Sequence, residues 1–193
     1  MVIFEELIIE VNNLLKKLNI NFIFSGAIAA NLYRTIPRAT MDIDIAIPFK
    51  QQILEKIKEN LEDFTFEDWE LLEKRFDVKK KYPDVIVPEH VRLKHSSGYE
   101  IDLFPLYSNY LANKRKAKIM NYEIEVIGPE DLILLKSLFN RYKDRDDILN
   151  ILENFNVKLD LRYLIKELKE FERDEIIKHI KNIRSKEFTN KSI

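Results

Sequence analysis

The chain of 193 residues is 46% hydrophobic and 34% charged, which fits one ordinary domain or a compact core with a smaller helical extension and excludes disorder as the default. Its formal net charge of −1 gives no overall attraction for nucleic acid, so a polyanion would have to bind at a local basic patch. The absence of cysteine excludes a disulfide framework, a thiolate zinc site and a cysteine nucleophile.

The apolar runs, such as residues 20–24, are far shorter than the roughly 20 residues that cross a bilayer. Glu5 and Glu6 also stand where a signal peptide would carry basic residues. The sequence therefore predicts a cytoplasmic protein with no membrane partner.

Hydrophobic spacing and helix-breaking residues predict the elements in chain order, beginning with an amphipathic helix from Phe4 to about Asn19. Strands are expected over residues 21–24, 42–47, 90–94, 99–106, 116–120 and 122–127. Further helices are expected over residues 27–33, 50–62, 129–140, 145–153, 160–171 and 174–184, followed by a polar frayed tail. Residues 63–88 carry two prolines and many charges, and they predict only broken strands or loop.

This order of elements predicts the fold class and the domains. Strands and helices alternate up to Gly128, and no strand is expected after it. We therefore expect an α/β (α+β) core over residues 1–128 and a C-terminal helical region over residues 129–193.

Two pairs of acidic residues lie inside expected strands. Asp42 and Asp44 alternate with isoleucines and share one face, and Glu100 and Asp102 repeat this arrangement. If the two strands are neighbours, the carboxylates converge and repel one another unless a cation is present, and hard divalent ions such as Mg²⁺ prefer oxygen ligands. The sequence thus predicts a metal site, with a solvated sheet face as the alternative.

Ser25 and Gly26 end one expected strand and open the next helix. Backbone N–H groups at a helix N-terminus can bind phosphate, and a glycine lets the backbone approach closely. The alternative is an ordinary tight turn. Because the acidic pair follows about sixteen residues later, a phosphate site and a metal site would lie together, as phosphoryl transfer requires.

These residues carry a resemblance to a known family. The segments "FSGAIAANLYRTIPRATMDIDIAI" and "YEIDLF" resemble the nucleotidyltransferase superfamily of DNA polymerase β type. Arg38 and Thr40 before the acidic pair, and "GPEDLILLKSLFNRYKDRDDILNIL" with Lys143, Asp144 and Asp147, resemble the minimal AbiEii toxin-like group more narrowly. Ser25 stands where the superfamily normally has glycine.

The resemblance implies a mixed β-sheet flanked by helices and a two-metal mechanism. Asp42, Asp44 and Asp102 would be catalytic and would bind Mg²⁺ or Mn²⁺, with Asp102 completing the second metal site or acting as general base. The residues that would bind the nucleoside triphosphate, expected to be ATP, are Ser25, Gly26, Arg38, Thr40 and Lys136. The alternative for Lys136 is a solvated helix face.

The expected reaction is transfer of a nucleoside monophosphate to a hydroxyl of an acceptor, which could be a protein, a tRNA or a small molecule. A protein partner from a toxin–antitoxin pair is also expected. The alternative function is an inactive relative that binds a nucleotide or a partner protein. His90 fits no metal-ligand pattern and is expected to be an ordinary surface or half-buried residue.

Overall fold

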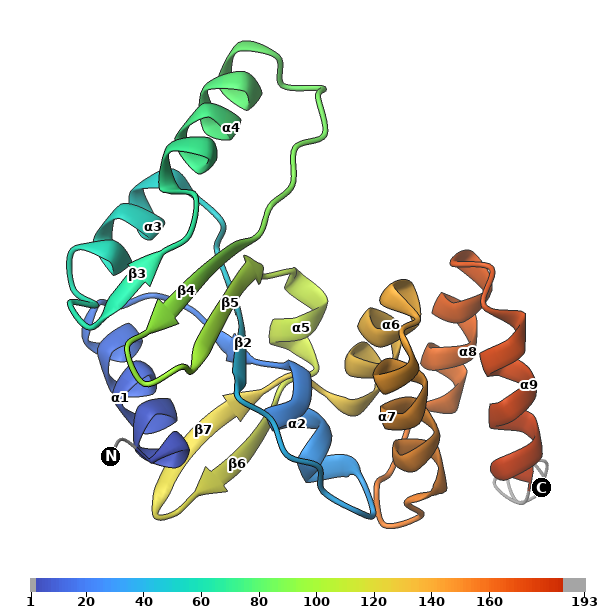
Figure 1. The fold of residues 1–193 in the computed structure, drawn as a ribbon. Coiled ribbons are helices and arrows are strands. Elements are labelled where there is room, and N and C mark those ends of the chain that lie inside the picture. The colour runs from blue at the N-terminus through green and yellow to red at the C-terminus, as the bar shows by residue number, and fades with distance from the viewer. Residues whose placement is uncertain (1–2, 186–193) are drawn as a thin grey trace. The chain divides into compact units, whose positions relative to one another are not determined.

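The computed structural model describes residues 3–185 and divides them into two compact units (Figure 1). Within the described residues, unit 1 comprises residues 3–28 and 40–126, and unit 2 comprises residues 29–39 and 127–185. Helix α2, Gly26–Tyr33, begins in unit 1 and ends in unit 2. The domain boundary expected at residue 128 stays a prediction.

Unit 1 contains a seven-stranded sheet in the order β3-β4-β5-β2-β1-β7-β6. The pairs β2–β5 and β1–β7 are parallel and the others antiparallel, which confirms the expected mixed sheet. The strands are β1 Ile23–Phe24, β2 Asp42–Ile47, β3 Phe64–Phe66, β4 Val91–His95, β5 Glu100–Pro105, β6 Arg115–Ile119 and β7 Tyr122–Val126. The other helices of this unit are α1 Phe4–Lys17, α3 Gln51–Lys58, α4 Trp69–Lys81 and α5 Ser108–Ala112.

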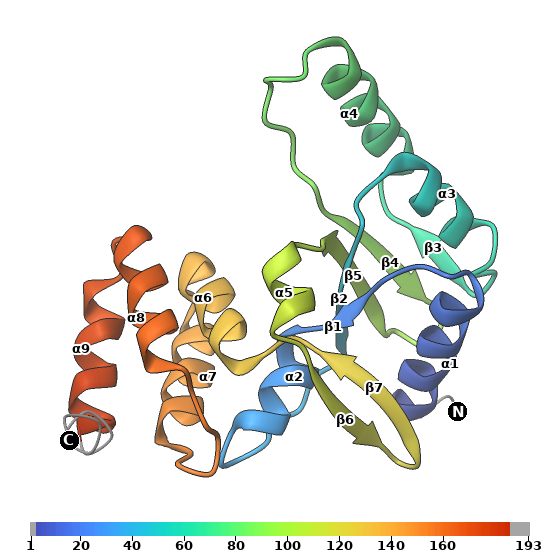
Figure 2. The ribbon, with the colours of Figure 1, turned by 180° about the vertical axis from the view of Figure 1, so that it is seen from behind.

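One face of this sheet carries the core of unit 1. Side chains alternate between the two faces of a strand, and Ile43, Ile45 and Ile47 of β2 are completely buried. Helices α1 and α3 lie side by side behind this face, where the Lys56 ammonium donates to the Leu18 carbonyl oxygen at 2.7 Å (Figure 2). The acidic residues that alternate with the isoleucines therefore lie on the opposite face.

The prediction for residues 63–88 was incomplete. The short strand β3 fits the expected broken strands, but α4 is a helix of 13 residues where no helix was expected. Leu72 is its only buried residue, so the sequence lacks the apolar stripe that normally reveals a helix. Helix α5, with five residues, was also not expected.

Unit 2 is helical after residue 127, in agreement with the sequence. Its helices are α6 Pro129–Phe139, α7 Tyr142–Glu153, α8 Leu161–Glu170 and α9 Asp174–Ile183. Asn140 adopts a left-handed conformation (φ 52°) that ends α6, and α7 begins three residues earlier than expected. The frayed tail predicted at the C-terminus lies, beyond residue 185, outside the described residues.

Among the helices of residues 3–185, none is both long enough and apolar enough to span a bilayer.

Candidate functional site

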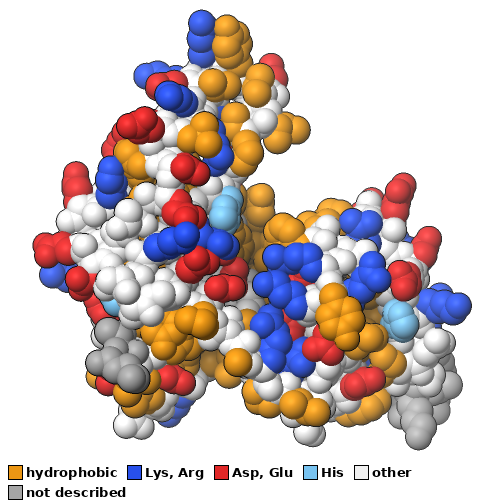
Figure 3. Space-filling view, viewed as in Figure 1, with side chains coloured by type: hydrophobic (Ala, Val, Ile, Leu, Met, Phe, Trp, Pro, Cys, Tyr) orange, Lys and Arg blue, Asp and Glu red, His pale blue; other side chains and the backbone are white. Residues whose placement is uncertain are grey.

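The acidic residues of β2 and β5 lie on one face of the sheet in unit 1. The two strands are direct parallel neighbours, and their register pairs Asp42 with Glu100 and Asp44 with Asp102. Charged side chains of both signs gather over β4 and β5 on the face seen in Figure 3. The two acidic strands are therefore neighbours, as the expected convergence of three or four carboxylates required, whereas the catalytic roles of these carboxylates stay predictions.

The turn into α2 is built against one of these carboxylates. The backbone N–H of Ser25 donates to the Asp44 carbonyl oxygen at 2.8 Å, and Gly26 has a positive φ of 56°. A Cβ atom on Gly26 would lie 1.7 Å from Oδ2 of Asp44, so only glycine fits at this position. The helix N-terminus and the Asp44 side chain consequently share one small region of unit 1.

Ser25 is completely buried in this turn, and within residues 3–185 its Oγ has no hydrogen-bond partner. A buried hydroxyl without a partner costs free energy, and such groups are rare in folded proteins. The orphaned Oγ therefore suits a group that accepts its hydrogen bond when a ligand is bound.

Thr40 has a local contact in the structure. Its Oγ1 accepts a hydrogen bond of 3.2 Å from the Asp42 backbone N–H, immediately before β2 begins. The contact fixes the chain where the acidic strand starts. The predicted contact of Thr40 with a nucleotide stays a prediction.

Asp102 is held by Arg92 of β4 and by His90, which directly precedes β4. Arg92 Nε and Nη2 each donate to one carboxylate oxygen at 2.8 Å, and His90 Nε2 lies 3.1 Å from Oδ1. Burial would raise the pKa of Asp102, but the hydrogen bonds from His90 and Arg92 outweigh it and hold that pKa well below its usual range. Asp102 is thus a firmly ionised carboxylate with a cationic partner inside the protein.

Sequence reasoning missed these partners. His90, Arg92 and Lys94 alternate with buried Val91 and Leu93, so the three basic side chains share one face of the strand. The register places Arg92 opposite Asp102 and Lys94 opposite Glu100, which creates favourable cross-strand pairs. The alternation of "HVRLK" was the available signal. His90 is exposed, as expected of a surface or half-buried residue, but its contact with Asp102 was not expected.

Only part of the predicted metal site fits a divalent cation. Asp42 and Asp44 supply the oxygen donors that Mg²⁺ and Mn²⁺ prefer, and Gly26 leaves the space in which Asp44 sits. Among residues 3–185, however, no group of three His, Cys, Asp or Glu side chains is arranged to hold a metal ion. Asp102 is instead bound on both oxygens by Arg92.

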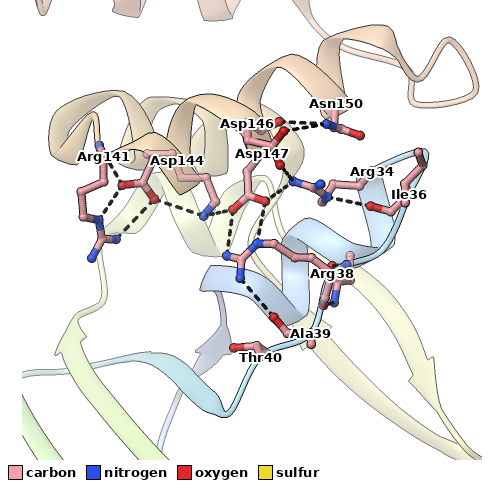
Figure 4. Close-up of polar contacts among 12 residues, drawn as sticks. Arg34, Ile36, Arg38, Ala39, Thr40, Arg141, Asp144, Asp146, Asp147 and Asn150 are labelled. Atoms are coloured by element: carbon pink, nitrogen blue, oxygen red, sulfur yellow. Dashed lines mark hydrogen bonds and ion pairs between the residues drawn. The ribbon is translucent and has the colours of Figure 1, made fainter.

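A second charged cluster lies wholly within unit 2, around Asp147 of α7 (Figure 4). The Asp147 side chain is completely buried, and Arg38 donates to both of its oxygens at 3.0 Å. Lys136 of α6 lies 2.7 Å from the same carboxylate, and Arg34 also donates to it. Burial would raise the pKa of Asp147, but the bonds from Arg38 and Lys136 lower it to about 2.

The neighbouring acid Asp144 lies three residues earlier on α7, so it shares a helix face with Asp147. Its carboxylate contacts Lys136 at 3.5 Å and accepts from Nε of Arg141 at 2.7 Å. Lys136 is only 6% exposed, which excludes the alternative of a solvated helix face. The predicted roles of Arg38 and Lys136 in nucleotide binding stay predictions.

Comparison with solved structures places the chain among nucleotidyltransferase folds. The lincosamide antibiotic adenylyltransferase LnuA, bound to lincomycin, has a TM-score of 0.53 at 18% identity, over 75% of this chain and 93% of LnuA. An antigenic nucleotidyltransferase-like protein from Paracoccidioides brasiliensis has a TM-score of 0.50 at 18% identity, covering 92% of each chain. The antibiotic-resistance factor ANT(2'')-Ia has a TM-score of 0.50 at 15% identity, over 96% of this chain and 93% of that one.

At these identities the structural neighbours establish the fold alone. A search of curated proteins found no match. The family model described as "Nucleotidyl transferase AbiEii toxin, Type IV TA system" matches residues 12–174, which is well over half of the chain. The chain, with its acidic pair on β2 and its Ser25-Gly26 turn, therefore belongs to the AbiEii nucleotidyltransferase family.

Proposed function

We propose that this protein transfers a nucleoside monophosphate from a nucleoside triphosphate, with ATP as the expected donor, to a hydroxyl of an acceptor. The observation that carries the proposal is the contact of the α2 N-terminus with Asp44. The turn to which we assign phosphate binding lies directly against the carboxylate to which we assign metal binding, so that even a methyl group on Gly26 would collide with Asp44.

In this proposal, the turn holds the triphosphate. The N-terminus of α2 directs its positive end at the phosphates, and the buried Ser25 hydroxyl gains the acceptor that it lacks in the free protein. Asp42 and Asp44 hold a divalent cation, Mg²⁺ or Mn²⁺, which when bound would neutralise phosphate charge. The acceptor oxygen attacks the α-phosphorus, and pyrophosphate leaves.

The remaining predicted residues keep proposed roles that rest on the family resemblance. Asp102 serves the reaction as a further metal ligand or as the general base for the acceptor hydroxyl. Arg38, Thr40 and Lys136 contact the nucleotide. We also propose a cytoplasmic location and a partner protein, in keeping with the toxin–antitoxin description of the family.

The acceptor is open between two classes. LnuA is a lincosamide antibiotic adenylyltransferase, which favours a small molecule, whereas the family is described as a toxin, which favours a protein or a tRNA. The hold of Arg92 on Asp102 favours a second candidate function, namely an inactive relative that only binds nucleotide or a partner protein.

Calorimetry with ATP and Mg²⁺ tests the proposal on the wild type and on an Asp42→Asn/Asp44→Asn variant. The expected result is binding by the wild type and loss of binding in the variant, because the carboxylates no longer attract the cation. Equal binding by both proteins, or none by either, would contradict it. Binding by the wild type with no transfer to supplied RNA, protein or small molecules would favour the inactive relative.

A further inference from the structure

Arg92 uses all of its guanidinium nitrogens on the acids of β5. Nε and Nη2 bind the two oxygens of Asp102, and Nη1 lies 2.8 Å from Oε2 of Glu100. The nearby acids raise the pKa of Arg92, so its charge is permanent. One fixed cation therefore offsets part of the negative charge of the two acids of β5, one of which, Asp102, is the third predicted catalytic carboxylate.

The Asp102 carboxylate cannot bind Arg92 through both oxygens and also bind a metal ion. A carboxylate offers about four lone-pair sites, and Arg92 and His90 already occupy three of those on Asp102. A second cation at this carboxylate would also face the charge of Arg92 at close range, where like charges repel. Binding of Arg92 and binding of a divalent cation at Asp102 thus oppose each other.

We propose that Arg92 is an internal counter-ion that holds Asp102 in the metal-free protein and competes with a divalent cation for this carboxylate. The inference rests on the proposed function, because it concerns the same metal site. It explains why Asp102, although in register with Asp44, does not join a three-carboxylate group among residues 3–185.

Arg92 has other acids to bind when it leaves Asp102. Its contact with Glu100 remains, and it lines a cavity of about 280 Å³ that is also bordered by Glu67, Asp68 and Arg75. A guanidinium moving within this cavity would keep carboxylate partners. The exchange therefore does not require a buried cation without a carboxylate partner.

The test is to titrate the protein with Mn²⁺ in the absence of nucleotide. Calorimetry measures the binding, and so does the decrease in the electron paramagnetic resonance signal of free Mn²⁺. Arg92→Gln removes the competitor, and we expect Mn²⁺ to bind about tenfold more tightly, as the loss of one charge-assisted pair implies. Arg92→Lys should fall between, since an ammonium cannot bind both oxygens as a fork does. Asp102→Asn should weaken binding.

Two controls separate this competition from a general electrostatic effect. Lys94→Gln removes a charge from the same strand, but Lys94 bonds to Glu67 at 2.6 Å and lies 3.9 Å from Glu100, so it does not compete for the Asp102 oxygens that Arg92 binds. We expect less than about a threefold change from it, because the charge is exposed and screened. In the double variant Arg92→Gln/Asp102→Asn, the tightening should disappear, since the carboxylate in competition is gone.

The outcomes are distinct for the two proposals. Unchanged or weaker Mn²⁺ binding by Arg92→Gln, in a protein whose melting temperature shows that it is folded, would overturn the competition. If the wild type still bound Mn²⁺ and lost it on Asp42→Asn, the proposed function would survive that result. Tightening that persisted in the double variant would also overturn the inference. Absence of Mn²⁺ binding in the wild type and in Arg92→Gln would reject both.

Discussion

Asp102 in unit 1 and Asp147 in unit 2 are both buried acids with arginine on both oxygens, yet their surroundings differ. Around Asp102, the acids of β2 and β5 outnumber the cations Arg92 and Lys94. Around Asp147, the cations Arg34, Arg38 and Lys136 equal in number the three acids that they bind, which are Asp144, Asp146 and Asp147. The first cluster therefore keeps an excess of negative charge, whereas in the second each acid has a cationic partner.

This difference separates the site that we propose to bind a cation from a network that holds helices together. The network of unit 2 joins the segment of residues 29–39 to α6 and α7 through the Asp147 carboxylate, with a further pair between Arg34 and Asp146, and its members are mostly buried. Removing its centre should therefore cost stability. Removing an acid of β2 should instead cost ligand binding.

The largest effect is expected from Asp147→Asn. The substitution leaves buried Arg34 and Lys136 without their shared partner, and we expect it to destabilise unit 2 by about 3–5 kcal/mol, as for other broken buried pairs. Urea unfolding, followed by hydrogen exchange in α7, measures this. The control is Asp146→Asn, whose half-exposed side chain binds only one edge of the cluster, with an expected loss below about 1 kcal/mol. Equal losses in the two variants would contradict the comparison.

Gly26→Ala should have the next largest effect, in unit 1. The new methyl group would collide with Asp44 at a residue of positive φ, and we expect a loss of about 2 kcal/mol in stability together with loss of nucleotide binding. Gly98→Ala is the matched control, because Gly98 also has a positive φ (91°) but open space around its Cβ position. Thermal unfolding and calorimetry with ATP and Mg²⁺ measure both variants. Gly98→Ala shows the effect of backbone strain alone, and the additional loss in Gly26→Ala shows the effect of the collision with Asp44.

Low pH should lower the stability that both clusters give to the fold, and for the same reason in each. The pKa values of Asp102, Asp144 and Asp147 are all lowered in the folded protein. Such groups stabilise the fold fully above their ordinary pKa of 3.8, and this stability is lost as the pH falls through that value toward the folded pKa, about 2 for Asp147. Unfolding measured from pH 6 downward should show a decline only below about pH 5. Asp147→Asn should flatten that decline in α7, and an unaltered slope would argue against the role of this carboxylate.

The smallest effect is expected from Tyr163→Phe in α8. The Tyr163 hydroxyl donates to Oδ1 of completely buried Asp131 at 2.7 Å, and its loss should cost about 1 kcal/mol. The side chain lies outside the Asp147 cluster, so nucleotide binding should be unchanged. Urea unfolding and calorimetry on the same sample check both statements, and altered nucleotide binding would contradict the separation drawn here.

Much of the fold could be predicted because its central strands have strong local patterns. The alternation of acids and isoleucines fixed both the strand and the face of Asp42 and Asp44, and the structure confirms it. Helix α4 could not be predicted, since a helix with one buried residue has no periodic apolar signal.

The partners of the acids were harder to predict than the acids. Pairing of Arg92 with Asp102 depends on strand register, and the saturation of Asp147 depends on contacts 109 and 113 residues apart in the chain. A single sequence carries no direct signal for such separations. The sequence predicted that a metal ion would compensate the charge of these acids. For Asp102, the structure shows that Arg92 does so.

The central claim, nucleotidyl transfer at the acids of β2, is tested most directly by incubating the protein with α-³²P-labelled nucleoside triphosphates and an extract of the cells that carry its gene. We predict that the wild type moves label onto an acceptor and releases pyrophosphate, and that Asp42→Asn/Asp44→Asn does neither. If none of the four nucleotides labelled any fraction, or if the variant labelled as well as the wild type, the claim would be wrong.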